Sequence, residues 1–169
     1  VPAARIVAAE NGGDRDRINE QAAELLVETA RGLRARIEGP AVLVLHFSIS
    51  GSALPNGLPV DQLREPVLEL GDLEALGFDA IVGGHIHVAS EFGERVLYVG
   101  SPMPLNFAEA GTEHGVWIVE MNPYAARFIP IESPRLITLD LEPGDGASGV
   151  LWPEMWDGAL EGAIVKVRG

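Results

Sequence analysis

Two continuous apolar runs, AVLVLHFS at 41–48 and FDAIVGG at 78–84, constrain the fold of this chain more than any other feature. Runs that are apolar without alternation are typical of strands covered on both faces, as in parallel sheets. A helix is predicted before each run, over 15–38 and 67–77. In the first of these helices the residues at helical spacing are Ile18, Ala22, Leu25, Thr29, Leu33 and Ile37. The first half of the chain is therefore expected to alternate helix with buried strand.

The second half reads differently, with little helix and several short strands. Strands are predicted at RVLYVGS (95–101), GVWIVEM (115–121), ARFIPIE (126–132) and RLITLDL (135–141). A further short strand is expected at ARIVAA (4–9). The pattern predicts an α/β or layered α+β fold in which antiparallel strands complete one sheet.

A turn-rich stretch, EPGDGASG at 142–149, suggests a boundary near the C-terminal end. We expect residues 1–143 to form one unit, and 144–169 to form a linker and the beginning of a capping domain. GAIVKVRG (162–169) alternates as a strand does, and Trp152 and Trp156 are expected to pack in a core or an interface. Because the chain begins at Val1 and ends after an apolar strand, we expect it to be a fragment or a processed piece.

Composition and charge exclude several kinds of site and partner. A hydrophobic content of 47% indicates a folded domain, and the absence of cysteine excludes disulfides and thiolate metal ligands. No apolar run approaches the ~20 residues of a membrane span and no signal peptide is visible, so we expect a cytoplasmic protein without a membrane partner. The net charge of −13, with Lys166 as the only lysine, argues against a module that binds DNA through its phosphates alone.

Three of the four histidines follow the two apolar runs. His46 ends the first run, and His85 and His87 follow the second in the pentapeptide GGHIH (83–87). Ligand sites of open α/β sheets lie beyond the carboxyl ends of the strands, where such histidines can meet. In an extended segment His85 and His87 would share a face, with Ile86 toward the core. The pattern predicts a metal site at His46, His85 and His87, with Gly83 and Gly84 leaving room for a metal or a phosphate, whereas His114 is expected to be structural.

These motifs resemble those of a known family. GGHIH resembles the Gly-His-x-His motif of the calcineurin-like metallophosphoesterases, and HFSISG (46–51) resembles the preceding element of their SbcD-type exonuclease branch. The segments at 97–121 (LYVGSPMPLNFAEAGTEHGVWIVEM) and 128–140 (FIPIESPRLITLD) are similar to the part of that branch that follows the histidine motif. The resemblance covers about residues 1 to 141 and implies the C-terminal half of a two-sheet αββα sandwich.

The resemblance also implies roles for particular residues. His46 and His85 match ligands of the second metal ion and His87 matches a ligand of the first, in a pair of divalent ions, most often manganese. The family's other ligands come from Asp-x-His, Gly-Asp and Gly-Asn-His-Asp motifs, which this chain lacks. Gly71-Asp72 comes too late in the chain for the bridging aspartate, so Asp72 is interpreted as a helix residue.

The family's function follows as an expectation. The parent protein is expected to be a manganese-dependent DNA exonuclease or endonuclease subunit acting in repair or recombination. The resemblance implies that the protein forms a homodimer and that it has an SbcC-type ATPase subunit as its partner. The general-acid histidine belongs to the missing motifs, so no catalytic residue is assigned in this chain, which is expected to be inactive alone. Two alternatives stay open, namely a calcineurin-like phosphoesterase acting on small phosphodiesters, and a non-catalytic module with an incomplete metal site.

Overall fold

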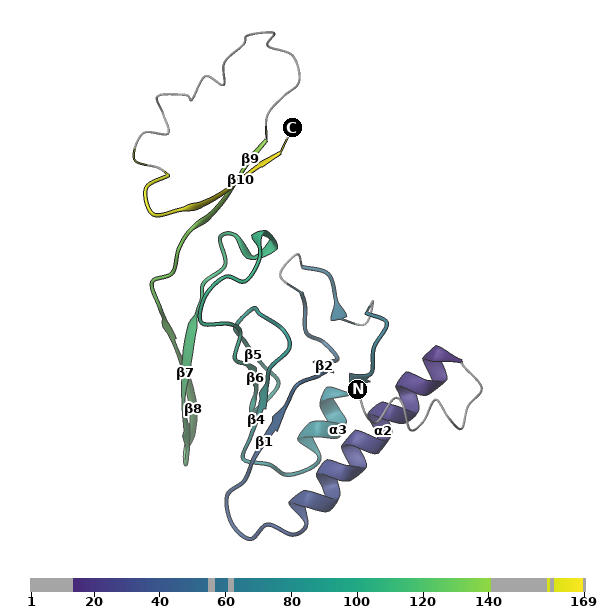
Figure 1. Ribbon diagram of the computed structural model, residues 1–169. Coiled ribbons are helices and arrows are strands. Elements are labelled where there is room, and N and C mark those ends of the chain that lie inside the picture. Colours follow the sequence, from purple (N-terminus) through teal and green to yellow (C-terminus); the bar gives the residue numbers. More distant parts are fainter. Residues whose placement is uncertain (1–13, 55–56, 61–62, 141–157, 159, 169) are drawn as a thin grey trace.

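The computed structural model describes residues 14–54, 57–60, 63–140, 158 and 160–168 (Figure 1). The strand predicted at 4–9, the region 141–157 and both Trp152 and Trp156 lie outside the described residues. The predictions made for them therefore stay predictions. None of the helices in the described part combines the length and hydropathy that crossing a bilayer requires.

The described residues form a mixed α/β structure with several small sheets. The main sheet has four strands in the order β1-β4-β6-β5. Its strands are β1 (Val42–Leu45), β4 (Ala80–Gly83), β5 (Ser90–Phe92) and β6 (Val96–Tyr98). β1 and β4 are parallel, as predicted for the two buried runs. β6 is also parallel to β4, although its segment was grouped with the antiparallel strands, and β5 completes the sheet in antiparallel orientation to β6.

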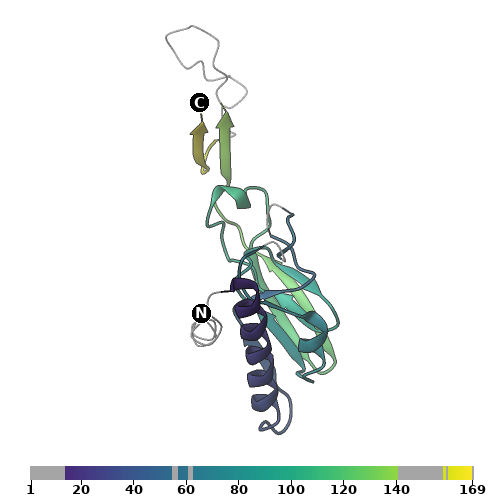
Figure 2. The same ribbon diagram turned by 90° about the vertical axis from the view of Figure 1, so that its right-hand side faces the viewer.

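Helix α2 (Arg15–Arg34) covers one face of this sheet (Figures 1 and 2). The Asp14 side chain caps its first turn by accepting a hydrogen bond from the Arg17 N–H. The helix is shorter than the predicted 15–38, and its buried face was predicted only in part, because Ala22 alone of the residues at the predicted spacing is among the buried ones. Its buried residues are Ala22, Val27 and Ala30, whereas Leu25, Leu33 and Ile37 are exposed. Periodicity predicts that a helix has an apolar stripe, but two overlapping stripes existed here and packing against the sheet used the other one.

The helix predicted over 67–77 is also shorter in the structure. Its beginning is strand β3 (Val67–Leu68), which pairs in parallel with β2 (Ser48–Ile49), and helix α3 (Leu70–Glu74) follows. The pairing with β2 fixes the first two residues as strand, because a long-range backbone ladder overrides local propensity. Asp72 lies in α3 and is exposed, in agreement with its interpretation as a helix residue.

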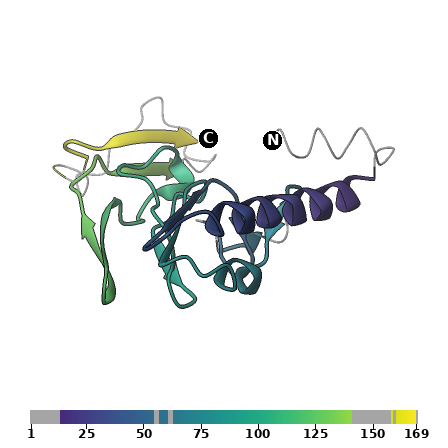
Figure 3. The same ribbon diagram turned by 90° about the horizontal axis from the view of Figure 1, so that it is seen from below.

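The strands predicted in the second half are confirmed. β7 (Gly115–Met121) and β8 (Tyr124–Pro130) form an antiparallel hairpin, and β9 (Leu136–Asp140) pairs in parallel with β10 (Ile164–Arg168). Figures 1 and 3 show the hairpin on the side of the main sheet opposite to α2 and α3, which gives three layers. A 3₁₀ turn, η2 (Phe107–Glu109), connects the main sheet to the hairpin and contacts β9.

β1 differs from the prediction that it is covered on both faces. Leu43 and Leu45 pack against the core, whereas Val42 and Val44 are 45% and 74% exposed. β1 is an edge strand of the four-stranded sheet, and none of the described residues covers its outer face. An apolar run thus identified a strand of a parallel sheet, but it did not reveal how many neighbours the strand has.

Candidate metal centre

The carboxyl ends of β1 and β4 meet at one edge of the main sheet. Leu45 and Gly83 are register partners, and the Gly84 N–H donates to the Leu45 carbonyl at 2.9 Å. His46 and His85 follow these two strands, and their ring centroids lie 5.3 Å apart with an interplanar angle of 64°. The topology therefore brings these two predicted residues together, as expected for side chains at the ends of neighbouring parallel strands.

The segment 84–87 is not the extended strand that was predicted. β4 ends at Gly83, and His85 has φ +84°, which makes it the only non-glycine residue with positive φ in the described part of the chain. Such a backbone costs on the order of 1–3 kcal/mol, and residues of this kind cluster at functional sites. Ile86 is buried, as predicted, but His85 and His87 contact different carboxylates instead of forming a common face.

Each of these two histidines has an acidic partner. Nε2 of His85 lies 2.7 Å from Oε1 of Glu65, and Nδ1 of His87 lies 2.8 Å from Oε1 of Glu109. Glu65 also accepts a hydrogen bond from the Ser48 hydroxyl at 2.6 Å. Metal-binding histidines commonly donate their second ring N–H to a carboxylate in this way.

Glu109 is the more deeply buried of the two acids, with a fully buried side chain. Its carboxylate accepts from the Leu105 N–H at 2.9 Å and from the Asn106 side-chain amide, in addition to His87. Burial alone would raise the pKa of this carboxyl. The hydrogen bonds from Leu105 and His87, together with the charges of His87 and His114, nevertheless hold the pKa below its usual value.

A cavity of about 350 Å³ lies between these groups. Both His85 and His87 line it, together with Glu65, Glu109 and Asn106, and Leu54, Leu63, Ile86 and Ala108 form its apolar part. A ligand bound by both imidazoles would lie in this cavity.

Tyr98 holds the backbone next to the site in place. This fully buried side chain donates to the Phe47 carbonyl at 2.9 Å and accepts from the Ile49 N–H at 2.7 Å, so it fixes the backbone that follows His46. Burial raises the pKa of the Tyr98 hydroxyl. The tyrosine ring also lies beside Gly83, which explains a glycine at this position without any ligand.

His114, the fourth histidine, is structural as predicted. It is 4% exposed, and both ring nitrogens have partners within the fold. Nδ1 lies 3.0 Å from the Ser101 hydroxyl oxygen and Nε2 lies 2.9 Å from that of Thr112.

The donor set fits part of a metal site. Imidazoles with carboxylate partners suit zinc, manganese or nickel, and His46, which is exposed, has a ring edge beside His85. In the described part of the chain, however, no three histidine or acidic side chains are arranged closely enough to hold an ion. The structure therefore brings His46 and His85 together and places His87 on the same cavity as His85. It does not assemble all three as a ready ligand set.

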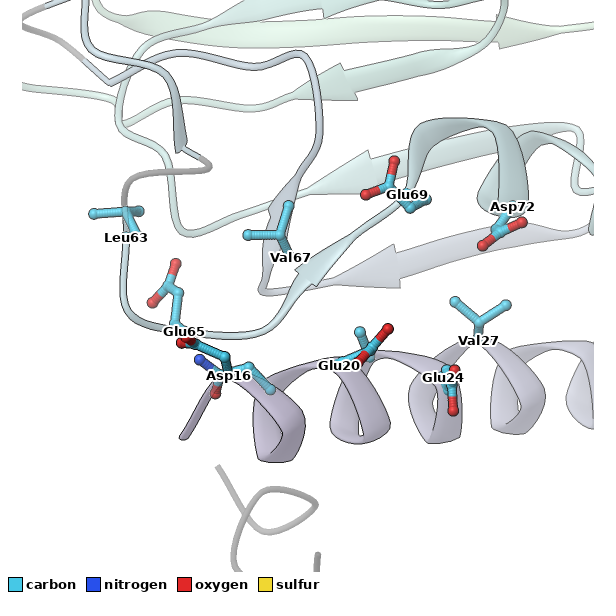
Figure 4. A pocket seen from close by; sticks show the side chains of 11 residues that line it. Asp16, Glu20, Glu24, Val27, Leu63, Glu65, Val67, Glu69 and Asp72 are labelled. Atoms are coloured by element: carbon cyan, nitrogen blue, oxygen red, sulfur yellow. The ribbon is translucent and has the colours of Figure 1, made fainter. Parts of the chain in front are cut away.

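A second hollow, of about 430 Å³, lies between α2 and the β3–α3 segment (Figure 4). It is strongly acidic, because six of its lining residues carry carboxylates: Asp16, Glu20, Glu24, Glu65, Glu69 and Asp72. No lysine or arginine lines it. A phosphate group would be repelled there, so this hollow does not extend the candidate site toward a nucleic acid.

Sequence reasoning missed Glu65, Glu109 and Tyr98. Glu65 and Glu109 lie 20 and 22 residues from the histidines they contact, so no local pattern connects them. For Glu109 a signal did exist, because it lies in the segment 97–121 that carries the resemblance, although no role was assigned to it.

Comparisons with known proteins add no assignment: no family model matches the chain, and no curated protein matches it.

Proposed function

We propose that this chain is the C-terminal part of the catalytic domain of a metal-dependent phosphoesterase, of the SbcD nuclease type. The observation that carries the proposal is the meeting of His46 and His85 at the ends of two neighbouring parallel strands. The left-handed backbone of His85 and the carboxylate partners of His85 and His87 support it. In this proposal His46, His85 and His87 are the metal ligands that the chain contributes.

The incomplete αββα sandwich belongs to the same proposal. Its support is the apolar surface on two elements that would face further strands. Val42 and Val44 are exposed on β1, and Val116 and Ile118 are 45% and 44% exposed on β7. Parallel sheets are normally covered on both faces, so in this proposal the exposed face of β1 packs against further strands.

Divalent metal ions bound at such a site would act as Lewis acids and orient a phosphodiester for in-line displacement. This chain would provide the ligands on one side of the two metal ions, while the bridging carboxylate and the general acid would come from outside the present sequence. DNA as substrate, an SbcC-type ATPase partner and a homodimer rest on the resemblance. The excess of acidic residues requires that contacts with DNA phosphates come from elsewhere in the assembly.

A non-catalytic module is the second candidate. The observation that favours it is the absence, among the described residues, of three assembled metal-ligating side chains. Both candidates expect the chain alone to be inactive toward phosphodiesters, so metal binding separates them better than activity does.

Isothermal titration of the intact chain with Mn²⁺ and with Zn²⁺ tests the proposal. We expect saturable binding that weakens at least about tenfold in His46→Ala and in His85→Ala, since each removes one ligand. Glu120→Gln, an exposed change on β7, serves as the control and should leave binding unchanged. Absence of binding, or binding that both histidine variants retain, would contradict the proposal and favour the non-catalytic module. The coding sequence upstream of Val1 provides an independent test, because the nuclease needs Asp-x-His, Gly-Asp and Gly-Asn-His-Asp motifs there.

A further inference from the structure

We propose that Glu109 and Glu65 are positioning residues, which hold His87 and His85 in opposite tautomers so that Nε2 of His87 and Nδ1 of His85 are available to a ligand. The contacts that carry this inference are those of the two carboxylates with Nδ1 of one ring and Nε2 of the other. That the ligand is a metal ion rests on the proposed function. The assignment of the tautomers does not.

Glu109 is surrounded by hydrogen-bond donors. Leu105 contributes a backbone N–H and Asn106 a side-chain amide N–H, and both are donors. The Asn106 amide is oriented independently, because its Oδ1 accepts from the Ala108 N–H at 2.8 Å. A carboxylate surrounded by donors is an acceptor, so the proton between it and His87 belongs to Nδ1 of the ring. In the neutral imidazole Nε2 then carries the free lone pair.

Glu65 faces the other type of ring nitrogen, Nε2 of His85. Its Oε1 accepts from the Ser48 hydroxyl and lies 2.7 Å from Nε2 of His85. The His85 proton therefore belongs to Nε2, which leaves Nδ1 with the lone pair. Among the described residues no hydrogen bond is made by the two remaining nitrogens, and the two rings line one cavity.

Long-range ¹H–¹⁵N correlation spectra of the ¹⁵N-labelled chain report the tautomer of each histidine directly. For the neutral rings we expect His87 as the Nδ1–H form and His85 as the Nε2–H form. Signals are assigned with single His→Gln variants. The opposite tautomer at either ring, or a doubly protonated ring, in the wild-type chain would overturn the assignment at that ring, and this result needs no carboxylate variant.

Substitution then separates positioning from simple structural support. In Glu109→Gln one amide group must face either the Leu105 N–H or His87, and facing His87 it would donate to Nδ1, so the Nδ1–H form should lose its dominance. His85 should stay unchanged in that variant. Glu65→Gln should affect His85 alone, and Glu120→Gln should affect neither ring. A His87 spectrum that is identical in Glu109→Gln and wild type would contradict the role of Glu109.

Metal titration distinguishes failure of this inference from failure of the proposed function. If the ligand is a metal, Mn²⁺ or Zn²⁺ binding should weaken by about 10- to 100-fold in Glu109→Gln. Predicted tautomers in a chain that binds no metal would refute the proposed function and leave the positioning role intact. Metal binding that Glu109→Gln does not weaken would refute the positioning role and leave the proposed function intact.

Discussion

Gly83 and Gly84 illustrate how neighbouring residues of the same type can have different tasks. A Cβ atom at Gly83 would lie 2.6 and 2.7 Å from two ring carbons of Tyr98, which is fully buried. A Cβ atom at Gly84 would lie 2.8 Å from Nδ1 of His46, whose ring is exposed. The absence of a side chain at Gly83 thus lets Tyr98 pack in the core, and its absence at Gly84 lets the His46 ring lie beside the end of the strand. The role expected for both glycines, room for a metal or a phosphate, stays a prediction.

Alanine at each position should separate these tasks. Gly83→Ala overpacks the core and should lower the free energy of unfolding by about 1–3 kcal/mol, because the buried tyrosine has no room to move. Gly84→Ala should cost less stability, because the exposed imidazole of His46 can turn aside, but it should weaken metal binding. Urea unfolding and metal titration measure the two effects. Equal stability losses in both variants would show that His46 is held as rigidly as Tyr98.

The edge strand β1 behaves differently from the central strands of the same sheet. Val44 is 74% exposed, whereas Val96 of β6 is completely buried. Both belong to short apolar strands and look alike in the sequence. The register places Val44 with Val82 and Leu97 on one face of the sheet, and Val96 with Ile81 and Leu43 on the other. In addition, β6 has neighbours on both sides, whereas β1 has β4 alone among the described residues.

Threonine is a matched probe of this difference, since it has nearly the shape of valine and carries a hydroxyl. Val96→Thr should destabilise the fold by about 1–3 kcal/mol, because its hydroxyl is buried without a partner. Val44→Thr should change the stability by less than about 0.5 kcal/mol, as exposed substitutions usually do. Chemical denaturation of both variants measures the contrast. A large loss in Val44→Thr would mean that another part of the chain or a second copy covers β1.

Considered as a whole, the molecule has an acidic surface and only two tyrosines, both with raised pKa values. Burial and the neighbouring Glu91 raise the pKa of Tyr124 to about 12, and its hydroxyl donates to Glu91 at 3.2 Å. This contact joins the hairpin β7–β8 to β5 of the main sheet. The ionisation of the tyrosines therefore reports on the packing of the layers.

Alkaline titration followed by tyrosinate absorbance should show both tyrosines ionising above the usual pKa of about 10 in the folded chain. In the unfolded chain the ionisation should occur near the usual value. The unfolded state then binds fewer protons above about pH 10, so the free energy of unfolding falls as the pH rises from there toward the folded-state values. Tyr124→Phe should remove the absorbance step near pH 12. A tyrosine in the native chain with the usual pKa would contradict the packing at that ring.

Local pattern was sufficient for much of this protein. Apolar runs placed the parallel strands β1 and β4, alternation placed β7, β8 and β9, and the positions after the runs singled out His46, His85 and His87. Spacing along the chain encodes these features, because the period of a strand or helix repeats within a few residues. The metal-binding role of the three histidines stays a prediction.

Contacts between distant residues settled the rest. They selected the buried face of α2, turned Val67 and Leu68 into a strand, and left one face of β1 uncovered by the described residues. They also gave His85 and His87 the carboxylates of Glu65 and Glu109, and gave Gly83 and Gly84 their neighbours Tyr98 and His46. Such pairings depend on which surfaces meet when the chain folds, and no short stretch of sequence records its partner across the core.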